Sequence, residues 1–185
     1  MPKFAANITT MFLEIPMSQR ISAAMACGFK AAELLLPYEW SSEEIRSWPG
    51  ADEIEFILMN TQPRTDEVAG CAALPGAVEE FRQGFDQTLQ YMNELDTSMV
   101  HLLAGKVSGD LAEAENCFID NVRWAADKAS DRIILLEALN NYDMPGYLHS
   151  KTEQTVKLID RIDRQNVKLQ FDFYHQQLME FLLHQ

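Results

Sequence analysis

The stretch Arg132-Ile-Ile-Leu-Leu-Glu137 is a short apolar run that ends in a carboxylate, and Val167-Lys-Leu-Gln-Phe-Asp172 repeats this pattern further along the chain. Runs of this length and composition are typical of buried strands. A buried ionised carboxylate must be paired, neutralised or bound to a metal. If both strands belong to one parallel barrel, their carboxyl ends lie on the same rim, and Glu137 and Asp172 point into one opening. The two runs therefore predict a site for a divalent metal.

Strand-like and helix-like segments alternate along the chain. The expected strands cover residues 4–8, 31–36, 54–60, 99–103, 132–137 and 167–173, and the expected helices cover 17–27, 41–48, 77–95, 112–129 and 152–162. The last three strands begin about 34 residues apart, close to the roughly 30 residues of a βα unit, which indicates a parallel sheet with helical crossovers. Residues 61–74 form a long polar stretch, where we expect a functional loop.

Two fold classes are compatible with this alternation, an open doubly wound sheet and most of a (β/α)8 TIM barrel. The first strand is not followed by a glycine-rich phosphate loop, which nucleotide-binding folds place there. Carboxylates and a histidine at the ends of late strands suit the barrel better. We therefore expect an α/β fold of the (β/α)8 TIM-barrel type with about six βα units, in a single domain over residues 1–185.

Charge and cysteine content restrict the class of partner and the compartment. The net charge of −13 opposes binding to nucleic acid or to an anionic membrane, because both need a basic surface. No apolar stretch approaches the roughly 18 residues that a membrane helix needs. The three cysteines are far apart and the N-terminus reads as the start of a strand, so we expect a cytoplasmic protein without a disulfide framework or a cysteine zinc site.

A set of short segments carries a family resemblance when the segments are taken in order. They are Phe-Ala-Ala-Asn at 4–7, Ala-Ala-Glu-Leu-Leu-Leu-Pro-Tyr at 31–38, Ala-Leu-Pro-Gly at 73–76, Asp-Asn-Val-Arg-Trp-Ala-Ala at 120–126, Leu-Glu-Ala-Leu-Asn at 136–140, Asp-Met-Pro-Gly at 143–146 and Leu-Gln-Phe-Asp-Phe-Tyr-His-Gln at 169–176. Together they resemble the hydroxypyruvate isomerase family, which belongs to the xylose-isomerase-like barrels. No single motif is specific, but the ordered set is.

The resemblance implies a metal site at the carboxyl ends of the barrel strands. In the family a glutamate ends strand 5, an aspartate ends strand 6, and strands 7 and 8 supply two further ligands. Glu137 and Asp172 match the first two positions, and such oxygen ligands favour Mg²⁺ or Mn²⁺. Glu137 is also implied as one member of the catalytic acid/base pair, with the strand 8 glutamate as the other. His175, in Asp-x-x-His, resembles a residue that contacts substrate in related ketose epimerases.

The implied activity is the interconversion of hydroxypyruvate and tartronate semialdehyde, a pair of small hydroxycarbonyl acids. The reaction removes a proton from the carbon beside a carbonyl and returns one to the neighbouring carbon, through an enediolate that a divalent metal stabilises. A 2-oxo-tetronate isomerase of the same family is an alternative that the sequence does not separate. A sugar epimerase or an endonuclease of the same superfamily is a weaker one, and the net charge of −13 argues against DNA.

Other residues are candidates for substrate contacts. Asn7 lies at the tip of the first strand, and Lys106, just after the fourth, is placed to offset a substrate carboxylate. His101 lies within the fourth strand, where alternation puts it on the same side as Leu103. Each has a structural alternative, with His101 as a core or rim histidine and Lys106 as a solvated lysine. Glu33 is expected inside the second strand, near the floor of the site, in a structural ion pair.

The chain is shorter than a barrel of this type, which takes about 250 residues. It stops soon after the sixth expected strand, and the tail beyond Glu180 does not resemble the family. We therefore expect strands 7 and 8 to be missing, so a second hypothesis is an inactive truncated fragment. The exposed edge strands of such a fragment invite pairing, which predicts a homo-oligomer as one way to cover them.

Overall fold

The computed structural model describes residues 2–63 and 68–181, and within them it contains one six-stranded parallel sheet in the order β1-β2-β3-β4-β5-β6. The predictions for 64–67, inside the expected loop, and for the tail at 182–185 lie outside the described residues. The strands are Ala5–Asn7 (β1), Ala31–Glu33 (β2), Glu55–Asn60 (β3), Met99–His101 (β4), Ile133–Glu137 (β5) and Val167–Gln170 (β6).

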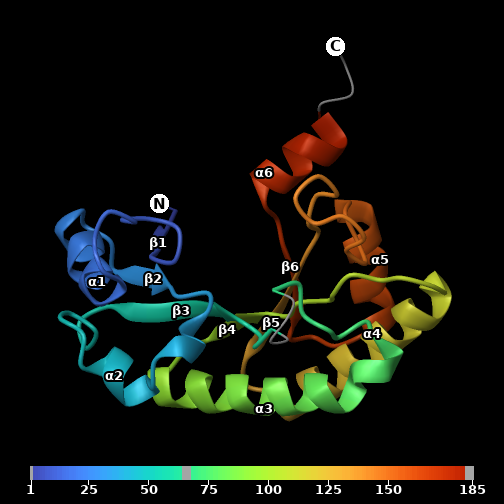
Figure 1. The fold of residues 1–185 in the computed structure, drawn as a ribbon, viewed down its shortest axis with the longest axis horizontal. Helices are drawn as coiled ribbons and strands as arrows, with labels where there is room; N and C mark the ends of the chain where they lie inside the picture. The colour runs from blue at the N-terminus through green and yellow to red at the C-terminus, as the bar shows by residue number, and fades with distance from the viewer. Residues whose placement is uncertain (1, 64–67, 182–185) are drawn as a thin grey trace.

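Helices connect the strands and lie on the outer side of the curved sheet (Figure 1). They are Met17–Ala26 (α1), Ser42–Arg46 (α2), Val78–Leu95 (α3), Leu111–Lys128 (α4) and Thr152–Ile162 (α5), with a short α6 at Phe173–Gln176 after β6. No helix in the described part of the chain is long and apolar enough to cross a membrane. This arrangement confirms the expected α/β fold, an incomplete barrel of the TIM type.

Side-chain alternation in the strands separates the packed face of the sheet from the functional face. In β5, Ile134 and Leu136 are fully buried, and by alternation Glu137 points to the opposite face. The buried side receives the apolar stripes of α3 and α4, whose largest fully buried side chains are Phe85 and Phe118. The core therefore lies between sheet and helices, and it leaves the concave face to polar residues at the strand ends.

β2, β4 and β6 end two or three residues earlier than the sequence predicts, and local irregularities are visible in β2 and β4. In β2 the register with β3 shifts between Ala32 and Glu33, the last residue of the strand. β4 ends at His101, since the backbone N–H of Leu103 donates to the side-chain Oγ1 of Thr61 at 3.0 Å. In both cases the expected strand continues as irregular chain, and the polar side chains there lie at the rim of the sheet.

The helix boundaries follow the local sequence more closely. Ser41 caps α2, with its Oγ accepting the backbone N–H of Glu44 at 3.1 Å, as the serine pair predicts. Gly28 follows α1 at a φ of 90°, where glycine is favoured. α5 covers the predicted residues 152–162. It ends, however, at Asp163 with a φ of 53°, in the left-handed region where the sequence offers no glycine.

Candidate active site

A cavity of about 460 Å³ lies at the C-terminal ends of the strands. Among the residues that line it are five of the six predicted from the sequence, namely Asn7, His101, Glu137, Asp172 and His175. They come from β1, from β4, from β5 and from the segment after β6. Because parallel strands present their carboxyl ends at one edge, residues far apart in the sequence meet there.

Lys106 does not line this cavity, and its backbone instead forms an isolated bridge with Tyr147. Its role as a substrate contact stays a prediction. The cavity lining in the described part of the chain contains the acids Glu33, Glu137 and Asp172 but no lysine or arginine. The cavity therefore gathers carboxyl groups without a fixed cation to balance them.

Glu137 ends β5, and only 6% of its surface is exposed. Gln170 donates a hydrogen bond from Nε2 to its Oε2 at 3.0 Å. Burial, and after it the nearby charge of Asp172, raises the pKa of Glu137 to about 8. A carboxyl group with a pKa near neutrality both takes up and releases protons at physiological pH, which is the property a general acid/base needs.

His101 lies beside Glu137, with Nδ1 3.4 Å from Oε2. Burial lowers the pKa of His101 to about 4, so its imidazole is neutral at neutral pH. With Glu137 protonated below pH 8, the contact joins two neutral groups and is not an ion pair. His101 and Leu103 both line the cavity while Leu102 does not, which confirms the alternation predicted for this segment.

Asp172 and His175 lie just after β6, which ends at Gln170 rather than at the predicted residue 173. Asp172 is the N-cap of α6, and its Oδ1 accepts the backbone N–H of His175 at 2.9 Å. Aspartate is a preferred N-cap, so the Asp-x-x-His spacing itself ends the strand and begins the helix. One ligand atom each of Glu137, Asp172 and His175 lies within 4.8 Å of the others.

The carboxyl groups of this cluster fit a divalent cation. The charge of Asp172 contributes to the raised pKa of Glu137, and a cation between the two groups would remove this repulsion. Carboxylate oxygens are the ligands that Mg²⁺ and Mn²⁺ prefer. Glu137 and Asp172 are therefore the described residues that could hold such an ion.

Glu33 lines the cavity, which agrees with its predicted place facing the barrel interior, and it is the last residue of β2. The ion pair predicted for it stays a prediction. None of the described ion pairs includes it. Burial raises the pKa of its carboxyl group, so Glu33 adds a third acid to the site.

Among the polar residues at this site that were not predicted from the sequence, Gln170 and Asn140 contact predicted ones. Gln170 holds Glu137 as described above, and Asn140 lies against His175, with the side-chain Nδ2 2.7 Å from Nδ1. Gln170 is the last residue of β6, and Asn140 follows β5 by three positions. Polar residues at strand ends are the signal that identified Glu137, and the same signal was available for both.

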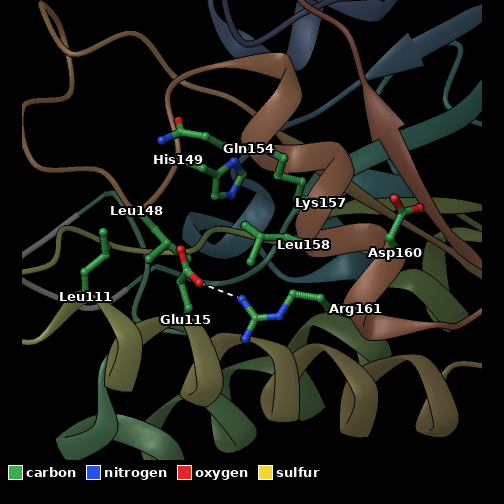
Figure 2. Close-up of a pocket in the computed structure, with 9 residues that line it drawn as sticks. All are labelled: Leu111, Glu115, Leu148, His149, Gln154, Lys157, Leu158, Asp160 and Arg161. Carbon is green, nitrogen blue, oxygen red and sulfur yellow. Dashed lines mark hydrogen bonds and ion pairs between the residues drawn. The ribbon is translucent and has the colours of Figure 1, made fainter.

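A second hollow, of about 410 Å³, lies between α4 and α5 and is separate from this site (Figure 2). An ion pair between Arg161 and Glu115 joins the two helices there, with Nη1 and Oε2 2.6 Å apart. His149 lines the hollow, with Nδ1 2.9 Å from Oγ1 of Thr155, and burial lowers its pKa to about 3. None of the residues predicted for the active site lines this hollow.

Comparison with known proteins identifies relatives that match nearly the whole chain. A hydroxypyruvate isomerase of Escherichia coli (strain K12) is 33% identical over 97% of this chain and 72% of its own length. A 2-oxo-tetronate isomerase of Cupriavidus necator is 35% identical, again over 97% of this chain and 72% of its own length. A structure from Brucella melitensis, described as an AP endonuclease of family 2, is 38% identical with a TM-score of 0.92, over 99% of this chain and 73% of that one.

The protein-family model described as "Xylose isomerase-like TIM barrel" matches residues 21–182 of this chain. That range contains β2 to β6 and all of the site residues described above except Asn7. Together with the relatives, this match shows that the chain belongs to the xylose isomerase-like TIM barrel family, within which it resembles the hydroxypyruvate and 2-oxo-tetronate isomerases.

Proposed function

We propose that this chain carries the metal-binding and proton-transfer residues of an isomerase that interconverts hydroxypyruvate and tartronate semialdehyde. The observation that carries the proposal is Glu137, a buried carboxyl group with a pKa of about 8 that shares one cavity with Asp172 and His175. The relatives are named as isomerases of small hydroxycarbonyl acids, and the cavity volume of about 460 Å³ accommodates a three-carbon acid.

Glu137 is the proposed acid/base. The side chain of Gln170 donates to Oε2, and His101 lies against the same oxygen. No described residue donates a hydrogen bond to Oε1, which leaves this atom, in the ionised carboxylate, to exchange a proton with one of the two substrate carbons, while the second acid/base group of the pair serves the other. Contacts on one oxygen hold the carboxyl group in place while the other reacts.

Asp172 has a different role in this proposal. Its Oδ1 is engaged by the α6 backbone, which fixes the direction of the carboxylate toward the cavity. Asp172 and Glu137 together would hold the divalent ion, which supplies Lewis-acid stabilisation of negative charge on the substrate oxygens. The wall contributes three carboxyl groups, so without a counter-charge the cavity disfavours an anionic substrate.

The chain spans 72% of the length of the two isomerases named above. The resemblance assigns the other two ligands and the second acid/base group to strands 7 and 8. The proposed activity therefore needs the part of the barrel that lies beyond this match. It is measured as hydroxypyruvate conversion in a fusion of the chain to the C-terminal part of the Escherichia coli relative that lies beyond the match.

The role of Glu137 is tested in the active fusion. Glu137→Gln is expected to lower kcat by several orders of magnitude, since the amide cannot accept the substrate proton. Glu153→Gln is the matched control, because Glu153 is an exposed acid on α5 away from the cavity. An unchanged kcat in Glu137→Gln would remove this residue from the mechanism.

A 2-oxo-tetronate isomerase is the second candidate, because relatives with that name match as well as the hydroxypyruvate isomerase. Measuring kcat/KM of the fusion for both substrates separates the two. DNA cleavage, the activity in the description of the Brucella structure, is disfavoured by the net charge of −13 and by the acidic cavity wall.

A further inference from the structure

His175 is held from one side by the loop between β5 and α5. The backbone N–H of Asn140 donates to Nδ1 of the imidazole at 3.2 Å, and the side-chain Nδ2 of Asn140 lies 2.7 Å from the same atom. A backbone N–H can only donate, so Nδ1 has to accept. A neutral imidazole that accepts at Nδ1 carries its proton on Nε2.

The orientation of the Asn140 amide is fixed by its other contacts. Oδ1 accepts the backbone N–H groups of Tyr142 at 3.0 Å and Asp143 at 2.9 Å, and only the oxygen can accept. Nδ2 consequently faces Nδ1 of His175 and Oδ2 of Asp143, the latter at 2.9 Å. Its two hydrogens match these two acceptors, and Asn140 has no solvent-exposed surface.

Asp143 extends this arrangement to the helix that carries His175. Its Oδ2 also accepts the hydroxyl of Tyr174 on α6 at 2.7 Å. The hydrogen bonds from Asn140 and Tyr174 lower the pKa of Asp143, so it is a carboxylate at neutral pH and can only accept. A chain of directed hydrogen bonds thus runs from Asp143 through Asn140 to His175.

We propose that Asn140, oriented by Asp143, is a positioning residue that fixes His175 as its Nε2–H tautomer, so that His175 donates a hydrogen bond to a substrate oxygen and does not ligate the metal. A protonated nitrogen has no lone pair for a cation. His175 lies within 4.8 Å of the two carboxyl groups, and of these three described groups Glu137 and Asp172 then remain as ligands.

The proposal predicts which part of the substrate His175 recognises. An N–H donor selects an oxygen acceptor, such as a carbonyl, a carboxylate or the enolate oxygen formed after proton removal. The identity of the ligand rests on the proposed function, whereas the tautomer does not. The tautomer is therefore measured in the chain itself, without substrate or turnover.

Long-range ¹H–¹⁵N spectra of the uniformly ¹⁵N-labelled chain report the tautomer, because protonated and unprotonated nitrogens of a neutral imidazole have well-separated ¹⁵N shifts. The spectra are recorded at about pH 8, above the ordinary pKa of imidazole, and His175→Gln assigns the signal. We expect Nδ1 unprotonated and Nε2 protonated, and the same pattern after addition of Mg²⁺ or Zn²⁺. A proton on Nδ1, or loss of the Nε2 proton when either metal is added, would overturn the proposal.

Variants distinguish the effect of the hydrogen bonds from Asp143 through Asn140 to His175 from a general effect on the packing of the loop. Asp143→Ala releases the Asn140 amide and should reduce the preference for Nε2–H by roughly fivefold, the equivalent of one hydrogen bond. Asp143→Asn should restore it, since its amide oxygen can still accept from Asn140 and Tyr174. Tyr142→Ala is the matched control, because this exposed side chain lies in the same loop. Equal tautomer ratios in Asp143→Ala and Tyr142→Ala would contradict the role of Asp143.

Discussion

Replacing Glu137 by glutamine should stabilise the metal-free chain, even though the same change should abolish activity. The carboxyl group has a pKa of about 8 in the folded chain against 4.5 as its ordinary value. Its folded-state pKa is raised, so its contribution to stability is fully present below pH 4.5 and is lost as pH rises toward 8. At pH 7 the loss amounts to about 3 kcal/mol, and above pH 8 it approaches about 5 kcal/mol. Glutamine is neutral at every pH and avoids this loss.

Urea unfolding of both proteins at pH 5 and pH 8, in the presence of EDTA, measures this difference. We expect similar free energies of unfolding at pH 5 and a higher value for Glu137→Gln at pH 8, with unchanged m-values. Glu153→Gln controls for the loss of one negative charge, since Glu153 is exposed on α5. Equal stability of Glu137→Gln and the parent chain at pH 8 would refute the assignment of Glu137 as a desolvated carboxyl group.

Metal ions should narrow the difference in stability between Glu137→Gln and the parent chain. An ion that binds only the folded chain adds about 2.7 kcal/mol at a hundredfold excess over its dissociation constant. Mn²⁺ should therefore raise the unfolding free energy of the parent chain but have little effect on Glu137→Gln, which lacks one carboxylate ligand. Stabilisation of both proteins by the same amount would place the ion elsewhere.

Two further predictions concern neighbouring groups. The imidazoles of His101 and His149 have pKa values lowered to about 4 and about 3, so both favour the folded chain above pH 6.5, and this stability is lost as pH falls through about 4. Urea midpoints between pH 7 and pH 4.5 should fall less steeply for His149→Gln than for the parent chain, and equal slopes would argue against a neutral buried ring. Asp172→Asn should weaken Mn²⁺ binding at least tenfold in calorimetry without melting α6, since asparagine is an equally good N-cap. Unchanged affinity would exclude Asp172 as a ligand.

Features of the fold that depend on local sequence were predictable. The bounds of α5, the cap of α2 by Ser41 and the glycine stop after α1 follow from capping preferences and helical spacing. The register shift between β2 and β3 at Glu33 was not predictable. Strand register is set by contacts between segments distant in sequence, so one chain segment read alone does not reveal where its strand ends.

In the candidate site, too, some features were predictable from the sequence and others were not. Glu137 and Asp172 were identifiable because an acid at the end of an apolar run is unusual, and the side of His101 followed from alternation. The partners that give these residues their chemistry were not. Gln170 and Asn140 are ordinary polar residues in the sequence, and their roles arise from hydrogen bonds across 33 and 35 positions of the chain.

The proton and the metal ion compete for the same carboxyl group, which links the instability of the site to its function. Between pH 4.5 and 8 the metal-free Glu137 is largely protonated in the folded chain, so an ion that binds there must displace a proton. Burial destabilises the ionised form of this carboxyl group. The attraction between the carboxylate and a bound cation offsets that cost. A solvated acid in this position would already be ionised at these pH values, so it would bind the ion with less dependence on pH.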